Sequence, residues 1–494
     1  MNAQLRHVAV VAAVLIAVLI GATTYWQAWA GGALANRQGN AVQLVAQLKV
    51  DRGDILAANG TRLAWSVAHK KGGLTTYSRR YLQNDAFSQV LGYATTGQTF
   101  TGLEQYLNDF LTGSNTTLTN TFSQELDRLN GKTVHGNDVT LTLRPGAQML
   151  AEQLLAGRCG AVVAMNPKTG AIYALASSPT YNPNLILEPG GYEKILKIKG
   201  TCGTPQALQN NATAGLYPPG STFKLVTASA ALDSGAFTPD STFYDPGYCV
   251  EYGQHVSNAG NPEGGAEAFG NVTLAQGLEH SINSVFCNVG KQIGAAKILD
   301  YAKRYGFYSS PPLDTPSNTI NPSGLYKNNK LFDPSDPTQV DPGRLAFGQD
   351  KMVVTPLQMA LVAATIANGG TEPIPYLVQK VTAPDGSIVS RTTPRTLGSP
   401  ISAKTAAELN QMMQLVVQGG TGTAAQIPGV TVAGKTGTAE TNTPGVYDAW
   451  FTCFAPATNP QVAIAVVVEK QPNGFGGSIS APIAKAILEN LLHR

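Results

Sequence analysis

The chain has little charge for its length. Only 13% of its 494 residues are charged, and 34 basic against 31 acidic residues leave a net charge of +3. This excess is too small, and the lysines and arginines are too scattered, to indicate a nucleic-acid partner. Apolar residues make up 43% of the sequence, which is typical of a globular protein. The length leaves room for two or three domains.

Cysteine and histidine are also scarce. The six histidines show no spacing typical of metal ligands, and no C-x-x-C occurs, so we expect no metal site and no cofactor. Because the cysteines number five, at least one thiol is unpaired. Cys202 and Cys249 flank the segment around Ser221 and could form a disulfide, or all five cysteines could be small buried apolar side chains. The five are Cys159, Cys202, Cys249, Cys287 and Cys453.

One apolar run is long enough to cross a membrane. Residues 8–22 are apolar or small, and residues 23–26 extend the run to the length of a bilayer span at about 1.5 Å per residue. Arg6 and His7 precede it, which predicts a cytoplasmic N-terminus and an extracytoplasmic remainder. Residues 28–30, Ala-Trp-Ala, could instead be a signal-peptidase site. We favour a retained anchor, because a signal peptide's apolar core is shorter, about 7–15 residues.

The rest of the chain divides into two regions. After a short stalk at 31–40, residues 43–155 alternate short apolar runs with Gly, Asn, Ser and Thr turns, which predicts a mostly β region. Residues 160–175 are typical of a strand, a turn and a strand, and they open a second, larger domain. Residues 309–343 are rich in Pro, Asn, Ser and Asp and are expected to form a long loop. In the second domain we expect helices at 223–232, 274–280, 283–290, 356–368 and 481–492, and strands at 430–438, 450–454 and 462–469.

The first of three short motifs supplies a nucleophile and a base. Ser221 and Lys224 form the only Ser-x-x-Lys of the chain, and their spacing places them on one helix face. Ser221 lies in the first helical turn, where free backbone N–H groups stabilise developing negative charge. Lys224 can accept the serine proton only if burial or a second cation, for which Lys435 is the candidate, lowers its pKa. The alternative is a capping serine with a solvent-facing lysine.

The second motif, Ser281-x-Asn283, lies in a predicted turn between two helices. Both residue types are common caps there, and Asn283 could cap the helix that runs to Gly290. In a catalytic role, Ser281 would pass a proton to the leaving amine and Asn283 would hydrogen-bond a substrate amide. Together with the first and third motifs, the pair favours a serine acyltransferase.

The third motif is Lys435-Thr436-Gly437-Thr438. Residues 429–436 match a nucleotide-binding P-loop pattern, but the residues between the glycines are strand formers and no helix can follow. On a strand, Gly437 would let a substrate backbone lie alongside, and the N–H of Thr438 could join that of Ser221 in an oxyanion hole. Lys435 and Thr436 would bind a carboxylate. A second Lys-Thr-Gly at 168–170 lies in a predicted hairpin turn and is not part of this site.

Seven further segments complete a pattern that a known family shares. They are Arg52-Gly53-Asp54-Ile55, Asn59-Gly60, Leu63-Ala64, Gly102-Leu103-Glu104-Gln105-Tyr106, Gly348-Gln349, Thr355-Pro356-Leu357-Gln358-Met359-Ala360 and Ala449-Trp450-Phe451. With Tyr217-Pro218-Pro219-Gly220 before the first motif, the chain resembles the class B penicillin-binding proteins, the membrane-anchored peptidoglycan D,D-transpeptidases, of an actinobacterial type. Ala57-Ala58 departs from the charged pair often found there.

The resemblance implies an α+β fold in four parts. These are a cytoplasmic tail at 1–7, a transmembrane anchor at 8–29, a mostly β pedestal of the dimerisation type at 30–155, and a transpeptidase domain at 156–494 with a central antiparallel sheet flanked by helices. The protein would be a single-pass protein of the plasma membrane with its catalytic domain outside. The pedestal would contact a membrane-embedded glycan polymerase and other proteins of cell elongation or division.

The resemblance also implies a reaction. Ser221 would attack the penultimate D-alanine of a donor stem peptide, with Lys224 as base and Ser281 helping to protonate the leaving amine. Lys435, Thr436 and Thr438 would hold the donor carboxylate, an acceptor amine would then complete the cross-link, and β-lactams would acylate the same serine. The alternatives are a D,D-carboxypeptidase or serine β-lactamase, which share the three motifs, and a non-catalytic β-lactam sensor or scaffold.

Overall fold

The computed structural model describes residues 2–25, 48–82, 85–95, 100–114, 135–204, 207–251, 253–258, 267–334, 336 and 339–493. Helix α1 (Asn2–Thr24) contains a stretch from Arg6 to Thr24 with a mean hydropathy of 2.3, and none of it is buried by the rest of the protein. Within the described residues it is the one helix long and apolar enough to cross a membrane, so it fits a single-pass anchor. The predicted stalk and the Ala-Trp-Ala segment lie outside the described residues.

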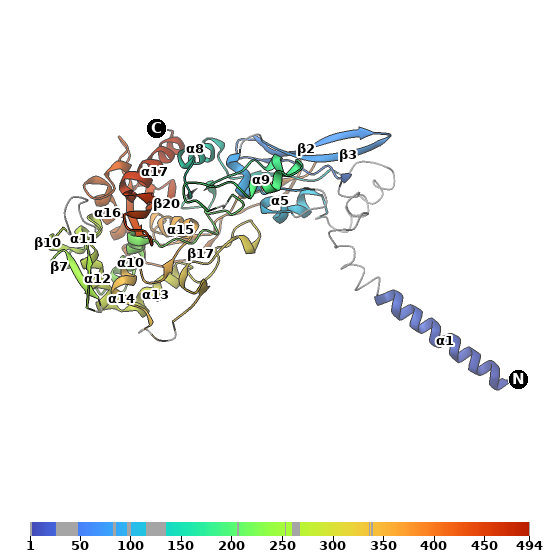
Figure 1. Ribbon diagram of the computed structural model, residues 1–494, viewed down its shortest axis with the longest axis horizontal. Helices are drawn as coiled ribbons and strands as arrows, with labels where there is room; N and C mark the ends of the chain where they lie inside the picture. Colours follow the sequence, from blue (N-terminus) through green and yellow to red (C-terminus); the bar gives the residue numbers. More distant parts are fainter. Residues whose placement is uncertain are drawn as a thin grey trace.

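The next region is built on a six-stranded sheet with the strand order β16-β15-β4-β1-β2-β3. Strands β1 and β4 run parallel, and the other neighbours are antiparallel. The hairpin of β2 and β3 extends away from the body of the molecule (Figure 1). The elements are β1 (Ile55–Leu56), β2 (Arg62–Lys71), β3 (Leu74–Tyr81), β4 (Asp138–Leu141), β15 (Val378–Thr382) and β16 (Ile388–Arg391), with short helices η2 (Asp85–Phe87), α4 (Ser88–Leu91), α5 (Gly102–Tyr106) and α6 (Asn108–Leu111).

A buried ion triad ties this sheet to helix α5. Glu104 is fully buried and accepts from Arg52 at 2.9 Å and from Arg79 at 2.6 Å. Burial opposes its ionisation, but the two arginines outweigh burial and hold the pKa of Glu104 below its usual value. Two of the family-like segments, one around Arg52 and one around Glu104, therefore meet in space through this contact.

The larger region is centred on a five-stranded antiparallel sheet with the order β18-β19-β20-β5-β6. Along β20, side chains alternate between two apolar cores, Ala463 and Ala465 in one and Ile464 and Val466 in the other. Helix α15 covers the first face, and α8 and α17 cover the second. The bounds are β5 (Gly160–Met165), β6 (Ile172–Ser178), β18 (Ala433–Glu440), β19 (Val446–Ala455), β20 (Val462–Pro472), α8 (Pro145–Leu155), α15 (Pro356–Ala367) and α17 (Gly476–Leu492). The predicted antiparallel sheet flanked by helices is thus confirmed.

Further helices and small sheets surround the motifs. The predicted capping box at Thr273 is confirmed, as is the cap of α15 by Thr355. Helix α17 begins at Gly476, five residues before the predicted start, and contains Pro482. The remaining elements include η3 (Pro183–Leu187), α9 (Gly191–Ile195), η4 (Gly220–Phe223), α10 (Lys224–Asp233), β7 (Thr242–Asp245), β8 (Tyr248–Glu251), β9 (Gln254–Ser257), β10 (Gly270–Thr273), α11 (Leu274–Glu279), α12 (Asn283–Ile293), α13 (Ala295–Arg304), β14 (Glu372–Pro373), β17 (Thr396–Gly398), α16 (Ala403–Gln418) and η7 (Thr423–Ala425).

The segment 309–343 has more structure than the predicted long loop. It contains η5 (Ser317–Thr319), β11 (Gly324–Lys327), β12 (Lys330–Leu331) and the start of α14 (Pro342–Ala346), and β11 also pairs with β13 (Met352–Val353). Asn328 and Asn329 form the two-residue turn between β11 and β12 with φ of +52° and +57°. Asparagine tolerates this conformation, so the pair favours a tight hairpin over an open loop.

Two disulfides form, and neither is the predicted Cys202–Cys249 pair. Cys159 bonds to Cys202, and Cys249 bonds to Cys287. Cys453 is the unpaired thiol and is buried in strand β19. The prediction was wrong because flanking the same segment does not bring two cysteines together, whereas β8 places Cys249 against the helix that carries Cys287.

Candidate active site

The turn that carries Ser221 is packed tightly against strand β18. Gly220 has a φ of +50°, and a Cβ on it would lie 3.0 Å from the carbonyl oxygen of Thr438. Trp450 in the neighbouring strand donates a hydrogen bond from Nε1 to the carbonyl of Pro218 at 3.0 Å. A Cβ on Gly348 would collide with the carbonyl of Gly220. Glycines are therefore required where this turn meets its neighbours, and the contacts hold Ser221 beside Thr438.

Lys224 is the first residue of α10 and is fully buried. Its Nζ donates to the carbonyl of Ser281 at 2.7 Å and to Asn283 Oδ1 at 2.9 Å, and it lies 3.4 Å from Ser281 Oγ. Within the described part of the chain, the Ser221 hydroxyl has no hydrogen-bond partner. The alternative of a solvent-facing lysine is therefore wrong, and the first motif is joined to the second through the lysine.

Ser281 lies between two lysines. Its hydroxyl accepts a hydrogen bond from Lys435 Nζ at 2.8 Å, while Lys224 approaches from the other side. Ser281 has a φ of +58°, which is an uncommon conformation for a residue other than glycine. Its side chain caps neither neighbouring helix. The backbone at Ser281 is thus held in a strained conformation where the three motifs meet.

Asn283 does not cap α12, contrary to the prediction. The N-cap is Ile282, and Asn283 is the first helical residue. Its side chain turns away from the helix backbone, because Oδ1 accepts from Lys224 and Nδ2 donates to the carbonyl of Ser257 at 3.0 Å. Both ends of the amide are therefore engaged, which fixes its orientation.

Burial sets the charge state of the two lysines. Burial first, and then the nearby charge of Lys435, lower the pKa of Lys224 well below its usual value. Burial lowers the pKa of Lys435 to about 7. A charge in a dry site is costly and two like charges repel, so both effects favour the neutral amine of Lys224. This is the direction that a base role for Lys224 would need.

The third motif lies on β18, the edge strand of the central sheet. Thr436 Oγ1 and Thr421 Oγ1 are hydrogen-bonded at 2.6 Å, and Thr438 Oγ1 accepts from the N–H of Gly476 at 3.4 Å. A Cβ on Gly437 would lie 2.9 Å from the carbonyl oxygen of Pro219 and 2.9 Å from Thr222 Cγ2. The chain's own turn therefore fills the space beside Gly437, so the glycine is required for internal packing.

The P-loop-like segment at 429–436 and the second Lys-Thr-Gly at 168–170 both have the structure expected from the sequence. Residues 433–440 form a strand, so the P-loop interpretation is excluded. Lys168 lies in the turn between β5 and β6 and donates to Asn459 Oδ1 at 2.8 Å on the surface.

Two polar contacts of the site were not predicted from the sequence, that of Thr421 with Thr436 and that of Ser257 with Asn283. Thr421 follows Gly419-Gly420, a turn signal, whereas nothing in the sequence marks Ser257.

Comparison with family models gives two matches. The model described as the penicillin binding protein transpeptidase domain matches residues 160–489, and the one described as the penicillin binding protein A dimerisation domain matches residues 52–139. The first range contains the central sheet and all three motifs, and the second contains β1, β2, β3 and the ion triad.

Two mycobacterial relatives are similar over nearly their whole length, and a third over part of it. The peptidoglycan D,D-transpeptidase PbpA of Mycolicibacterium smegmatis is 34% identical, covering 99% of this chain and 98% of that protein. PbpA of Mycobacterium tuberculosis is also 34% identical, covering 100% and 99%. The peptidoglycan D,D-transpeptidase MrdA of Escherichia coli is 29% identical over 79% of this chain and 64% of that protein.

Solved structures have the same fold. The D,D-transpeptidase domain of a peptidoglycan glycosyltransferase from Eggerthella lenta matches with a TM-score of 0.75 and 34% identity, covering 90% of this chain and 99% of that one. Penicillin-binding protein A from M. tuberculosis, solved as its ceftriaxone acyl-enzyme, matches with a TM-score of 0.75 and 31% identity, again covering 90% and 99%.

Proposed function

This chain belongs to the penicillin-binding protein transpeptidases, and from that membership we propose how its own residues carry out the reaction. It is a serine-type peptidoglycan D,D-transpeptidase, an enzyme of cell wall synthesis that β-lactams acylate. The residue roles below rest on the positions of the three motifs.

Ser221 is the nucleophile. Its oxygen attacks the carbonyl carbon of the penultimate D-alanine of a donor stem peptide, and neutral Lys224 takes the hydroxyl proton. Burial of Lys224 and the nearby charge of Lys435 support this role, because both favour the neutral amine. Lys224 contacts Ser281 and Asn283 in this structure, and catalytic hydrogen bonds to a nucleophile often tighten only in the complex with substrate.

Ser281 passes a proton to the leaving amine of the terminal D-alanine. Its hydroxyl lies between Lys224 and Lys435, so a proton taken from Ser221 can reach the leaving group through one intermediate oxygen. An acceptor amine then attacks the acyl-serine, and reversal of the proton path regenerates Ser221. The amide of Asn283 hydrogen-bonds the donor peptide during these steps.

The donor carboxylate and the oxyanion bind along β18. The Thr436 and Thr438 hydroxyls lie on the edge strand, with the charge of Lys435 behind them. The N–H groups of Ser221 and Thr438 form the oxyanion hole, because the contact of Gly220 with Thr438 brings the two backbones together. Gly437 contributes because it has no side chain, which lets strand β18 pack closely against the turn that carries Ser221.

The observation that carries these roles is the shared contact of Lys224 and Lys435 with Ser281. The test is product analysis with a donor pentapeptide and an acceptor strand. Dimeric cross-linked muropeptides with release of D-alanine are expected from the wild type and not from Ser281→Ala. Release of D-alanine by the wild type without any dimer would contradict the transpeptidase assignment.

The membrane arrangement is proposed from α1 and the charges before it. Arg6 and His7 favour a cytoplasmic N-terminus, with the catalytic domain outside the membrane. We assign residues 1–7 to the tail, 8–29 to the anchor, 30–155 to the pedestal and 156–494 to the transpeptidase domain; the matched ranges 52–139 and 160–489 support the order of these parts. Two elements cross this division, because α8 packs on the central sheet of the larger region and β15 and β16 complete the sheet of the pedestal. Protease should cleave the catalytic domain only from the outer face of intact protoplasts.

The pedestal is proposed to bind a membrane-embedded glycan polymerase of the elongation or division machinery. The support is its dimerisation-type sheet between the anchor and the catalytic domain, with the projecting β2–β3 hairpin (Figure 1). Co-purification from membranes of the full chain, but not of a variant in which residues 66–78 of the hairpin are replaced by a short turn, would support this contact. Equal recovery of the polymerase with both would contradict it.

A further inference from the structure

A small hairpin holds the amide of Asn283 from behind. Strands β8 and β9 pair so that Tyr248 lies opposite Ser257 and Cys249 opposite Val256. The carbonyl of Ser257 accepts the hydrogen bond from Asn283 Nδ2. The position of this hairpin therefore decides whether the amide has its second partner.

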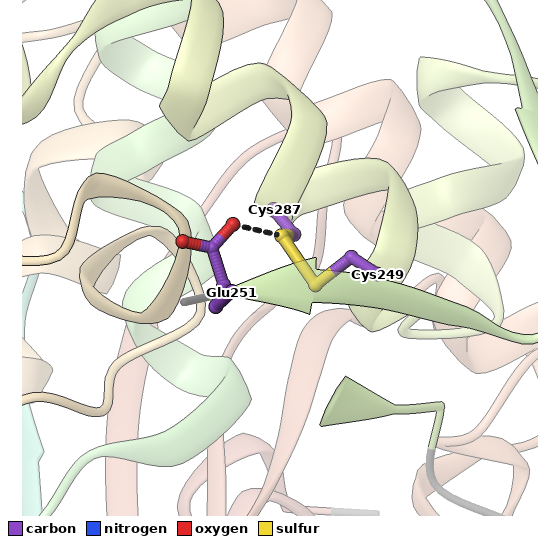
Figure 2. A group of neighbouring side chains, drawn as sticks. All are labelled: Cys249, Glu251 and Cys287. Carbon is purple, nitrogen blue, oxygen red and sulfur yellow. Dashed lines mark hydrogen bonds between the residues drawn. A yellow bond between two sulfur atoms is a disulfide. The ribbon is translucent and has the colours of Figure 1, made fainter. Parts of the chain in front are cut away.

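The hairpin is also bound covalently to helix α12, one turn after Asn283. Cys249 of β8 is disulfide-bonded to Cys287 of α12, and Cys287 is four residues after Asn283. Glu251 Oε1 lies 3.1 Å from Cys287 Sγ (Figure 2). Lys291 Nζ lies 2.7 Å from Glu251 Oε1 and donates to the carbonyl of Val250. A covalent bond and an ion pair thus bind β8 to α12.

This group is enclosed by helix α14. Cys287 is completely buried, and Cys249 and Glu251 are each 5% exposed. A Cβ on Gly343 would lie 2.5 Å from Glu251 Oε1 and 3.0 Å from Cys287 Sγ, so α14 packs directly over the group. Such enclosure makes the disulfide a constant connection rather than one that exchanges with solvent thiols.

From this geometry we propose that the Cys249–Cys287 disulfide is a positioning element of the acylation site that acts through Asn283. The disulfide fixes β8, β8 fixes Ser257 by strand pairing, and the Ser257 carbonyl keeps Asn283 Oδ1 directed at Lys224. Without the disulfide, the hairpin can move by a fraction of an ångström and the amide loses its fixed orientation. The inference rests on the role proposed above for Asn283.

We expect the fold to survive loss of the disulfide. The start of α12 has a separate polar connection, because Asn258 Oδ1 accepts from the N–H of Ser284, and Asp245 accepts from the Ser284 hydroxyl and from Asn258 Nδ2. These contacts lie next to the hairpin and do not involve either cysteine. The expected defect is therefore one of geometry at Asn283.

The test compares two disulfide deletions in the full chain. Cys249→Ser/Cys287→Ser removes the proposed positioning element, and Cys159→Ser/Cys202→Ser is the matched control, since the two disulfides close loops of 38 and 43 residues and contribute similarly to stability. The second-order rate of acylation by a fluorescent penicillin is measured well below the unfolding temperature of each variant. We expect about a ten-fold loss for the first variant and less than two-fold for the control.

A second arm repeats both deletions in an Asn283→Ala background, with acylation followed for hours by intact mass. We expect the Cys249/Cys287 deletion to have no further effect there, because its path runs through the missing amide. Equal losses in the two disulfide variants, or an undiminished ten-fold loss in the Asn283→Ala background, would overturn the inference. A wild-type rate for Asn283→Ala alone would instead overturn the role of Asn283.

Discussion

Lys435 Nζ donates a hydrogen bond to the hydroxyl of Ser281 at 2.8 Å, and this contact joins the edge strand of the sheet to the turn between two helices. Lys224 reaches the same residue from the helix that follows the nucleophile. Two buried amines therefore share one serine. Because no carboxylate of the described residues forms an ion pair with either lysine, each is easier to neutralise than a surface lysine.

Replacing Lys224 by arginine should abolish acylation. Arginine keeps a positive charge but stays protonated, so it cannot take the Ser221 proton. We expect the rate of labelling by a fluorescent penicillin to fall by at least about a thousand-fold, within the range that general-base catalysis supplies. Near-UV circular dichroism would check that the variant is folded. Labelling at close to the wild-type rate would exclude Lys224 as the base.

The pH dependence of acylation should change in the Lys435→Met variant. In the wild type we expect the rate to rise with pH as Lys224 loses its proton, because burial and the nearby charge of Lys435 lower the pKa of Lys224. Removing that charge raises the pKa of Lys224, so the acid limb of the rate profile should move to higher pH. The profile is measured from pH 5 to 9 with the second-order acylation rate. A shift to lower pH would contradict this electrostatic relation.

The ion triad of the pedestal should matter far more for stability than an exposed ion pair. Glu104→Ala leaves Arg52 and Arg79 without their buried partner, which should lower the free energy of unfolding by about 3–5 kcal/mol. The control is Arg62→Ala, which removes an exposed contact with Asp54 and should cost less than about 1 kcal/mol. Urea unfolding of the two variants provides the comparison, and equal losses would contradict it.

The buried carboxyl of Glu372 should lower the free energy of unfolding as pH rises. It is 2% exposed, its Oε1 has no hydrogen-bond partner within the described residues, and burial raises its pKa to about 8. Between pH 4.5 and 8 the unfolded chain releases a proton that the folded chain keeps, so unfolding becomes easier with pH, by up to about 1.4 kcal/mol per pH unit. Glu372→Gln should remove this slope in urea unfolding.

The exposed residue Glu188 provides the control for Glu372. Glu188→Gln should keep the wild-type dependence of stability on pH, because its side chain is solvated in both states. If Glu372→Gln also keeps that dependence, the buried carboxyl does not hold its proton in the folded protein.

Much of this fold could be predicted from local sequence. The cap at Thr273, the apolar strand 462–469 and the Pro-Gly stop before Ser221 act within a few residues, so the sequence alone determines them. Strands β15 and β16 join the first sheet from residues 378–391, and no local signal says which sheet a short strand will complete.

The sequence named residues that the structure brings together, but it did not predict their contacts. Asn283 has the composition of a helix cap, yet tertiary partners at Lys224 and Ser257 turn its amide away from the backbone. Gly437 is needed for contact with Pro219 and Thr222, which lie more than 200 positions away in the sequence. Such long-range packing, like the pairing of Cys249 with Cys287, leaves no trace in residue spacing.

The central claim is that Ser221 forms the acyl-enzyme in the site that Lys224, Ser281 and Lys435 enclose. The direct measurement is intact and peptide mass spectrometry of the protein after reaction with a fluorescent penicillin. The account predicts one adduct on the peptide that contains Ser221 and none in the Ser221→Ala variant. An adduct that persists in Ser221→Ala, or one on another peptide, would contradict it.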